Sequence, residues 1–378
     1  MNRKILEKFY EEEFMPLIKK NNMEVNKRLW EESEKLWLGI KKELQEAFEK
    51  IYEMQQKQEM EPVAYIQLVL LRSRCLSKDC RYAMMVYGKD WYLGKEYHAG
   101  DINAEFVLGM FPDLQLQLEK ASRKYIGKIS QTDVERLLLE ETGRSVYYVH
   151  TLLRIWRDAI LNLAEYEKTE KADRIRIEVG EYYEPGIPLY YRDKGKSEKE
   201  MRRRLRKKAV HTGMDFSGMS FDGQVFTGHQ YENTNFSEAV FRNAQIKKCN
   251  AMGAMFHGAV MTNAYLYRCI LQGSVWKGCD LRDTTLEECI MYRGVKEEEG
   301  NLLPDIEGMV LEDCRLEGTI FKRCIMNGMD FTKTDIRGCT FEECSVEGCR
   351  FLAGQETCLD ISEDQKETIH WVQGGKKS

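Results

Sequence analysis

The sequence lacks the segments that direct a chain into or across a membrane. No apolar run reaches the ~18 residues that a membrane-spanning helix needs. The first residues, MNRKILEKFYEEEF, carry too many charges for a secretory signal peptide. An excess of one charge is also missing, since 57 basic and 62 acidic residues leave a formal net charge of −5. These absences predict a cytoplasmic protein that does not associate with membranes, and a net charge that by itself identifies no partner.

Motifs for catalysis and metal binding are missing as well. No GxSxG, Walker loop or Rossmann fingerprint is present, and paired acids such as Glu140 and Glu141 lie in ordinary polar runs. No histidine belongs to an HExxH or HxH pattern or has a cysteine at ligand spacing. The six histidines are His98, His150, His211, His229, His257 and His370, of which His229 and His257 are expected at the surface. We therefore predict a non-enzymatic protein with no cofactor and no metal; an enzyme hidden in the N-terminal part is the open alternative.

A repeat with a period of five dominates the second half of the chain. Stepping by five from Phe216 to Met291, and again from Ile306 to Phe351, gives 26 positions that are all apolar, although only 43% of the chain is apolar. Nine of them are Tyr231, Ile246, Ala251, Met261, Met291, Ile306, Met326, Ile336 and Val346. The other 17 are predicted to form a large interior column: Phe216, Phe221, Phe226, Phe236, Phe241, Phe256, Leu266, Leu271, Trp276, Leu281, Leu286, Leu311, Leu316, Phe321, Phe331, Phe341 and Phe351.

A period of five fits neither an α-helix nor a β-strand and indicates a solenoid, in which each unit buries its apolar side against neighbouring coils. Two residues before each large side chain stands a small one, often Ala or Thr, which suits a narrow shared interior. Nine of the 12 cysteines occupy this small column: Cys249, Cys269, Cys279, Cys289, Cys314, Cys324, Cys339, Cys344 and Cys349. They are read mainly as small buried apolar residues of a reducing compartment, and a thiol column for metal or redox chemistry is the alternative. No C-x-x-C pair supports zinc.

These residues resemble the pentapeptide-repeat family, whose motif is A(D/N)LXX. Local matches are Asn235-Phe236 after Thr234, Asp280-Leu281 after Cys279 and Asp330-Phe331 after Met329. The residue before the large one is often Val, Ile or Tyr instead of Asp or Asn, and Cys often replaces Ala. The resemblance, over about 140 of 378 residues, implies a right-handed, four-sided β-helix for residues 209–358 with four repeats per coil.

Residues 1–192 are predicted to form a mainly α-helical domain with minor β structure, of no recognised family. Helices are expected over 4–20, 24–58, from Pro62 to about 76, and over 103–110, 113–126, 130–142 and 144–168; a hairpin is expected in 81–93 and strands at 174–183 and 187–191. Within 24–58, apolar residues repeat every seven from Trp30 to Ile51. This face is expected to pack inside the domain, with helix pairing in a homodimer as the alternative.

Three charged or irregular segments flank and interrupt the repeat. Residues 193–208, DKGKSEKEMRRRLRKK, are predicted to be a basic linker or short helix, in which Arg202, Arg203, Arg204 and Arg206 are candidates for binding an acidic partner. The insertion at about 292–305 contains Glu297, Glu298 and Glu299. It keeps the five-residue phase of the repeat, because positions 291 and 306 differ by 15, a multiple of five. Its acidic run is either solvated or partner-binding, and its deletion from Arg293 to Leu303 is expected to leave the rod folded. Residues 359–378 are expected to supply a capping helix, over 362–373, and a tail.

Two classes of function follow. In the first, the chain is an interaction protein whose rigid rod binds a protein partner. The resemblance also implies one special case, because some family members mimic duplex DNA and bind DNA gyrase and related topoisomerases; residues 212–356 have the matching sign, with 22 acidic and 14 basic residues. In the second, residues 1–192 bind a ligand or catalyse a reaction, which a deep pocket in that domain would favour. Direct nucleic-acid binding is not expected, since one basic block without interleaved aromatic residues is a weak signal.

Overall fold

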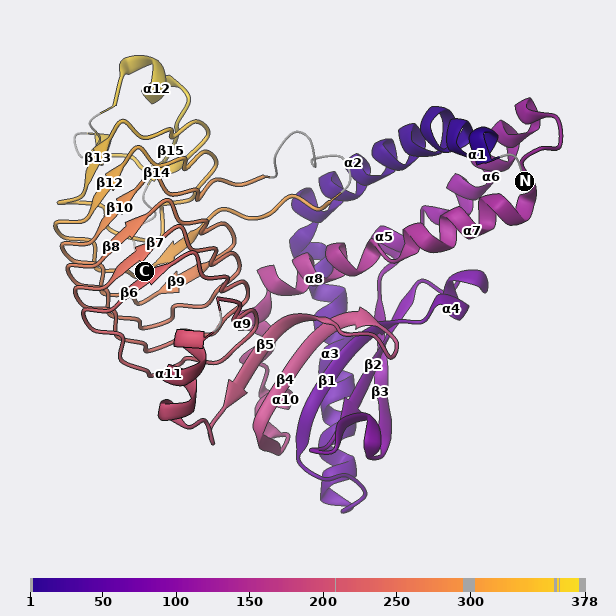
Figure 1. Ribbon diagram of the computed structural model, residues 1–378, viewed down its shortest axis with the longest axis horizontal. Coiled ribbons are helices and arrows are strands. Elements are labelled where there is room, and N and C mark those ends of the chain that lie inside the picture. Colours follow the sequence, from indigo (N-terminus) through magenta and orange to yellow (C-terminus); the bar gives the residue numbers. More distant parts are fainter. Residues whose placement is uncertain (1–2, 208, 295–302, 357–358, 360, 374–378) are drawn as a thin grey trace. The chain divides into compact units, whose positions relative to one another are not determined.

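The computed structural model describes residues 3–207, 209–294, 303–356, 359 and 361–373. The chain forms two compact units, drawn in Figure 1. The first comprises Met1–Leu189 together with Val295–Asp305, and the second comprises Tyr190–Gly294 together with Ile306–Ser378. The first unit is therefore discontinuous in sequence, since it includes most of the segment that interrupts the repeat. Among the described residues, no helix combines the length and apolar character needed to cross a bilayer.

The helices of the first unit largely follow the predicted spans. They are α1 (Arg3–Phe9), the π-helical η1 (Tyr10–Phe14), α2 (Met15–Glu31), α3 (Ser33–Gln56), α5 (Glu105–Leu108), α6 (Phe111–Ser122), η3 (Arg123–Tyr125), α7 (Gln131–Thr142), α8 (Ser145–Ile155), α9 (Arg157–Leu161) and α10 (Ala164–Lys168). The expected capped start of α7 at Ser130 is confirmed, because Ser130 and Asp133 form a reciprocal capping box. The break expected at 21–23 is wrong: α2 runs through it, since Ile18, Val25 and Leu29 continue one buried face, and ends at Glu31.

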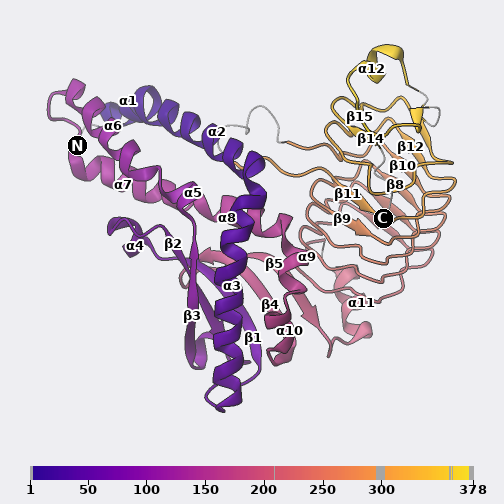
Figure 2. The ribbon, with the colours of Figure 1, turned by 180° about the vertical axis from the view of Figure 1, so that it is seen from behind.

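A five-stranded sheet of order β3-β2-β1-β4-β5 completes the first unit. Its strands are β1 (Val63–Leu70), β2 (Arg81–Tyr87), β3 (Glu96–Asn103), β4 (Lys171–Glu181) and β5 (Ile187–Asp193), with α4 (Arg72–Leu76) after β1 and η2 (Trp91–Leu93) after β2. Helix α3 lies along one face of the sheet, as Figure 2 shows. Its heptad residues Trp37, Leu44 and Ile51 are buried, and Trp37 stacks on Trp156 of the same unit with ring centroids 5.3 Å apart, in agreement with packing inside the domain.

Two sequence-based expectations in this sheet are wrong. The helix expected from Pro62 to about residue 76 is strand β1, which pairs with β2 and with β4. A central strand buried on both faces has a continuous apolar sequence, and periodicity alone does not separate it from a short buried helix. The hairpin expected within 81–93 has only its first strand there, because β2 pairs with β3 and residues 91–93 form the short helix η2 between them.

The second unit is a solenoid of short parallel strands. Strands β6 (Val225–Thr227), β7 (Gln245–Lys247), β8 (Tyr265–Tyr267), β10 (Thr285–Glu287), β12 (Ile320–Lys322) and β13 (Thr340–Glu342) form one sheet; β9 (Val275–Lys277) pairs with β11 (Val310–Glu312), and β14 (Arg350–Leu352) pairs with β15 (His370–Val372). Phe226 pairs with Ile246 and Ile246 pairs with Leu266, each 20 residues on. One coil therefore contains four five-residue repeats.

The coils continue in register past the insertion. Trp276 pairs with Leu311 and Leu286 pairs with Phe321, each 35 residues on, which is one coil of 20 plus the 15 residues of the insertion. The prediction from phase is thus confirmed for the coils. Ile306 is an exception to the column: it is only half-buried, and its carbonyl oxygen accepts a hydrogen bond of 2.8 Å from the Gly294 amide at the neck of the insertion. The buried large column resumes at Leu311.

The segment expected as a basic linker or short helix forms a helix, whereas the helix expected at the C-terminal end is shorter than predicted. Residues within the expected basic linker form helix α11 (Glu198–Lys207), whose Met201 and Leu205 belong to the buried core of the solenoid. Residues 362–373 hold only a short helix, α12 (Glu363–Glu367), followed by strand β15. Ile369 is buried in the same core and Trp371 packs against it. Each terminal segment thus places apolar side chains on the solenoid interior.

Candidate protein-interaction surface

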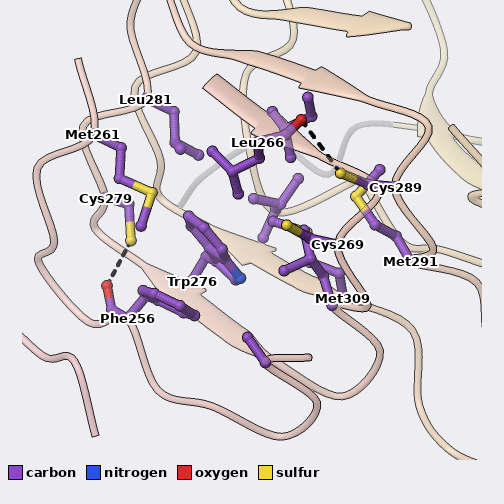
Figure 3. Packing of buried hydrophobic residues seen from close by; sticks show 14 of the residues in the cluster. Phe256, Met261, Leu266, Cys269, Trp276, Cys279, Leu281, Cys289, Met291 and Met309 are labelled. Carbon is purple, nitrogen blue, oxygen red and sulfur yellow. Dashed lines mark hydrogen bonds between the residues drawn. The ribbon is translucent and has the colours of Figure 1, made fainter. Parts of the chain in front are cut away.

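The large interior column fills the solenoid. All 17 side chains predicted for it are buried. Aromatic rings stack from coil to coil, with ring centroids 4.2 Å apart for Phe256 and Trp276 and 4.6 Å apart for Phe331 and Phe351. Figure 3 shows Trp276 among the packed apolar residues, and its indole nitrogen donates to the Ser274 hydroxyl at 2.8 Å. Among the described residues the interior is a packed core, with a hollow of only about 20 Å³ beside Phe226 and Tyr231.

The small column has a polar role that the sequence did not suggest. Several of its thiols and hydroxyls donate to the carbonyl oxygen of the large residue 23 positions earlier, one coil below: Cys279 to Phe256 at 2.7 Å and Thr284 to Met261 at 2.6 Å are examples. The nine predicted cysteines are all buried. In the part of the chain that the structure describes, no group of three or more His, Cys, Asp or Glu residues could hold a metal. The thiols therefore fill the narrow side of the interior and also donate hydrogen bonds between coils.

The basic candidates lie on helix α11. Arg202 donates to Glu198 and to the Ser220 carbonyl oxygen at 2.7 Å, which fixes the helix to the first coils. Arg203, Arg204 and Arg206 are exposed on the same helix. The acidic candidates Glu297, Glu298 and Glu299 fall outside the described residues, so the structure does not bring the two predicted groups together.

Most charges on the outer faces of the solenoid are paired with opposite charges. Arg268 pairs with Glu288 at 2.5 Å, Lys277 with Glu312 at 3.0 Å and Lys322 with Glu342 at 3.2 Å, each between neighbouring coils. Arg323 joins the same row by pairing with Glu287 and Glu288. Without residues 292–308, the segment 212–356 still has 17 acidic and 12 basic residues, so most of its acidic excess lies in the coils. Along the row of Arg268, Glu288 and Arg323, however, opposite charges alternate from coil to coil.

One outer face is free of charge over its central coils, and we call it the isoleucine face. In the row of residues just before the large column, Ile270 pairs with Ile290 and Ile290 pairs with Ile325, each by a β-bridge between successive coils. The row continues to Asn250 and Gln230 on one side and to Ser345 on the other. The parallel row, two residues on, holds Met252, Gln272, Tyr292 and Asn327, with Glu232 and Glu347 at its two ends. Ile325 is 42% exposed, and Ile270 and Ile290 are half-exposed.

A buried glutamine fixes one edge of the isoleucine face. Gln272 is only 6% exposed and donates to the carbonyl oxygens of Tyr292, at 3.0 Å, and Gly294, at 2.8 Å. It thereby holds the first residues of the insertion against the coil. The face is thus a row of stacked apolar side chains on a fixed backbone.

The sequence reading did not single out this face, although its signal was present. At the position before the large residue, the family motif has Asp or Asn, and this chain has Ile at 270, 290 and 325. These isoleucines become neighbours only because one coil contains four repeats, which places residues 270, 290 and 325 above one another in successive coils. The two histidines expected at the surface, His229 and His257, are half-buried. The His229 ring stacks on Tyr231 with centroids 5.4 Å apart, and burial lowers its pKa.

Comparisons with known proteins agree with this geometry. The family model for pentapeptide repeats matches eight copies, in residues 234–273, 259–293 and 310–348. Among solved structures, the chain resembles HetL, a pentapeptide repeat protein involved in heterocyst differentiation regulation from Nostoc sp. strain PCC 7120, with 16% identity over 43% of this chain and 76% of HetL and a TM-score of 0.27. It also resembles full-length QnrB1, a plasmid-mediated fluoroquinolone resistance protein, with 13% identity over 42% of this chain and 96% of QnrB1 and a TM-score of 0.22.

A third such structure is Rfr23, a pentapeptide repeat protein from the cyanobacterium Cyanothece 51142, with 13% identity over 47% of this chain, all 100% of Rfr23 and a TM-score of 0.18. With TM-scores this low, the three likenesses say nothing of function. A search of curated proteins found no match. Residues 234–293 and 310–348 of this chain therefore consist of pentapeptide repeats.

Proposed function

We propose that this chain is a non-enzymatic interaction protein whose β-helix presents the isoleucine face to a protein partner. The observation that carries the proposal is the row of Ile270, Ile290 and Ile325 on a surface whose other faces carry paired charges. Depletion of charge with enrichment of apolar side chains marks the centre of protein interfaces. The partner would present an uncharged apolar strip of its own.

The surroundings of this row fit the same interpretation. Neutral polar residues continue it at both ends, with Asn250 on one side and Ser345 on the other. An apolar centre with a polar rim is the usual anatomy of a protein interface. The row from Asn250 to Ser345 crosses five coils. At a spacing of about 4.8 Å between coils, it is about 19 Å long. That is shorter than a standard interface requires, so the partner is expected to bind transiently or to contact adjoining surface as well.

A DNA-mimic function is the second candidate, motivated by the acidic excess of 22 against 14 residues between 212 and 356. Mimicry of duplex DNA requires a continuous negative surface, because DNA carries one charge per about 1.7 Å of helix axis. The pairing of Arg268, Lys277 and Lys322 with carboxylates on adjacent coils interrupts such a surface. The charge pattern therefore favours a different kind of protein partner over DNA gyrase.

The test uses the full chain with substitutions on two faces. Replacing Ile270 and Ile290 by Lys should abolish capture of the partner from source cells. The matched control replaces Val240 and Val260 by Lys, because these residues occupy the same repeat position, are also half-exposed and lie on another face. Far-UV circular dichroism and thermal melting establish that both variants remain folded.

A photo-crosslinking side chain at position 290, with position 285 as the control site, should link the partner only at 290. If both double variants lost capture of the partner, or if neither did, the isoleucine face would not be the binding surface. Inhibition of purified DNA gyrase by the wild-type chain, retained in the I270K/I290K variant, would instead support the DNA-mimic function.

A further inference from the structure

The first unit contains a pocket that the protein-binding proposal does not use. It has a volume of about 240 Å³ and lies between the turn after α4 and helices α6 and α7. Its apolar walls include Leu108, Phe111, Leu138 and Leu139. Leu108 and Leu138 are buried, whereas Phe111 and Leu139 are half-exposed at the opening. An apolar hollow open to water is a favourable place for an apolar group of a ligand.

The polar groups around the pocket are mostly satisfied by protein partners. The Asp79 carboxylate accepts two hydrogen bonds from Arg81, at 2.7 and 2.9 Å. The Glu135 carboxylate accepts one from Gln131 at 2.9 Å. Gln115 and Thr142 also donate within their own helices, at 2.8 and 2.7 Å. These groups are therefore poorly placed to recognise a polar ligand.

Lys78 differs from the other polar residues that line the pocket. Its side chain is exposed, and no ion pair to it occurs within the described residues. It is the one basic residue in the lining. Two cysteines, Cys75 and Cys80, complete this wall as free, half-buried thiols. Burial raises the pKa of both thiols, so they are neutral at physiological pH and form part of the apolar wall.

We propose that this pocket binds a small aliphatic monocarboxylate. The tail lies against Leu108, Phe111 and Leu138, and the carboxylate meets the Lys78 ammonium at the rim. A volume of about 240 Å³ is below the roughly 300–1,000 Å³ of pockets for drug-sized ligands. The expected ligand is therefore a short aliphatic chain, and octanoate serves as the probe.

The test is calorimetric titration of the full chain with three probes of equal chain length. Octanoate should bind saturably at one site, and 1-octanol should bind about fivefold more weakly, because an exposed ion pair contributes at most about 1 kcal/mol, which is about fivefold in affinity. Octylamine, whose charge Lys78 repels, should bind more weakly than 1-octanol. K78Q should weaken octanoate binding by the same factor and leave 1-octanol unchanged. The matched control is K120Q, on exposed α6 surface outside the pocket.

Blocking the pocket supplies an independent test. L139W places a larger side chain at the half-exposed opening and should abolish binding of both octanoate and 1-octanol, whereas L116W, on the exposed side of α6, should not. Bound octanoate should also slow alkylation of Cys75 and Cys80 in the wild-type chain. Equal binding of octylamine and octanoate, unchanged binding in L139W, or no saturable binding of octanoate would each overturn the proposal. None of these outcomes bears on the isoleucine face.

Discussion

The Cys279 thiol donates a hydrogen bond to the carbonyl oxygen of Phe256, 23 residues earlier, at a sulfur–oxygen distance of 2.7 Å (Figure 3). Phe256 lies in the coil below, and its carbonyl oxygen also accepts from the Ala259 amide at 3.0 Å. Thr284 and Thr319 make the same inter-coil bond with their hydroxyls, to Met261 and Leu281. The small column thus does more than save space: it gives buried carbonyl groups a second donor.

This relationship predicts an order of stability among substitutions at Cys279. Thr and Val have nearly the same shape, but only Thr can donate to the Phe256 carbonyl oxygen. We expect the Cys279→Thr variant to be more stable than Cys279→Val by about 1 kcal/mol in free energy of unfolding. Urea denaturation followed by circular dichroism measures the difference. Equal stability of the two variants would show that the inter-coil bond contributes nothing.

Burial also predicts which thiols react. In the native chain, Cys75 and Cys80 should react with Ellman's reagent, while the nine interior cysteines should react only after unfolding. Burial excludes the reagent and raises the pKa of Cys249 and Cys349 to about 12, which removes the thiolate. Cys358 lies outside the described residues, so the measurement uses a Cys358→Ser background. Rapid reaction of more than two thiols at neutral pH would contradict the interior placement.

The stability of the first unit should depend on pH through His150. This side chain is 4% exposed, its Nε2 lies 3.1 Å from the Pro188 carbonyl oxygen, and burial, followed by the charge of Arg154, lowers its pKa to about 3. An unfolded histidine has a pKa of about 6.5. Between these values the unfolded chain binds a proton that the folded state excludes, so stability should fall as the pH drops below about 6.5, by about 1.4 kcal/mol per unit. Near pH 3 this decline should end.

The control for this prediction is His150→Gln, which keeps an amide donor for the Pro188 carbonyl oxygen and removes the titration. Urea unfolding at pH 7 and pH 5, followed by tryptophan fluorescence, should give a smaller difference for this variant than for the wild type. The same difference in both proteins would assign the pH dependence to other groups.

The insertion should matter to the first unit and not to the coils. The Asn26 amide nitrogen donates to the Leu303 carbonyl oxygen at 3.1 Å, and its side-chain oxygen accepts from the Asp305 amide at 2.9 Å. Deleting Arg293 to Leu303 should leave the β-helix folded, because strands on both sides pair directly, but it should destabilise the first unit by about 1–3 kcal/mol through the buried Asn26. Hydrogen exchange measures the two units separately. A loss of protection throughout the coils would show that the insertion is required for the solenoid.

The C-terminal segment is expected to protect the last coil. Strand β15 pairs with β14, Ile369 is buried in the solenoid core, and the Trp371 ring lies 6.0 Å from that of Phe351. Removing residues 362–378 should expose a strand edge and an apolar coil end, which lowers the melting temperature and promotes self-association. Size-exclusion chromatography and thermal melting test this, with removal of 374–378 alone as the control. If the shortened protein stayed monomeric with an unchanged melting temperature, residues 362–378 would not act as a cap.

The five-residue period is enough to identify the solenoid from the sequence. Each five-residue unit places its large residue in the same environment, so the period alone identifies the buried column from Phe216 to Phe351, and its phase predicts that the coils continue past the insertion. Helix boundaries with local chemistry, such as the Ser130 capping box, were predictable for the same reason. Such features depend on neighbours in sequence.

Other features depend on contacts between segments that are far apart in the chain. Strand β1 has an apolar sequence that fits a buried helix equally well, and its pairing with β2 and β4 settles the matter. Ile270, Ile290 and Ile325 are separate departures from a motif until the coils stack them into one face. The pocket around Lys78 gathers residues from the turn before β2 and from helices α6 and α7. These features arise from contacts between distant segments, which no local pattern encodes.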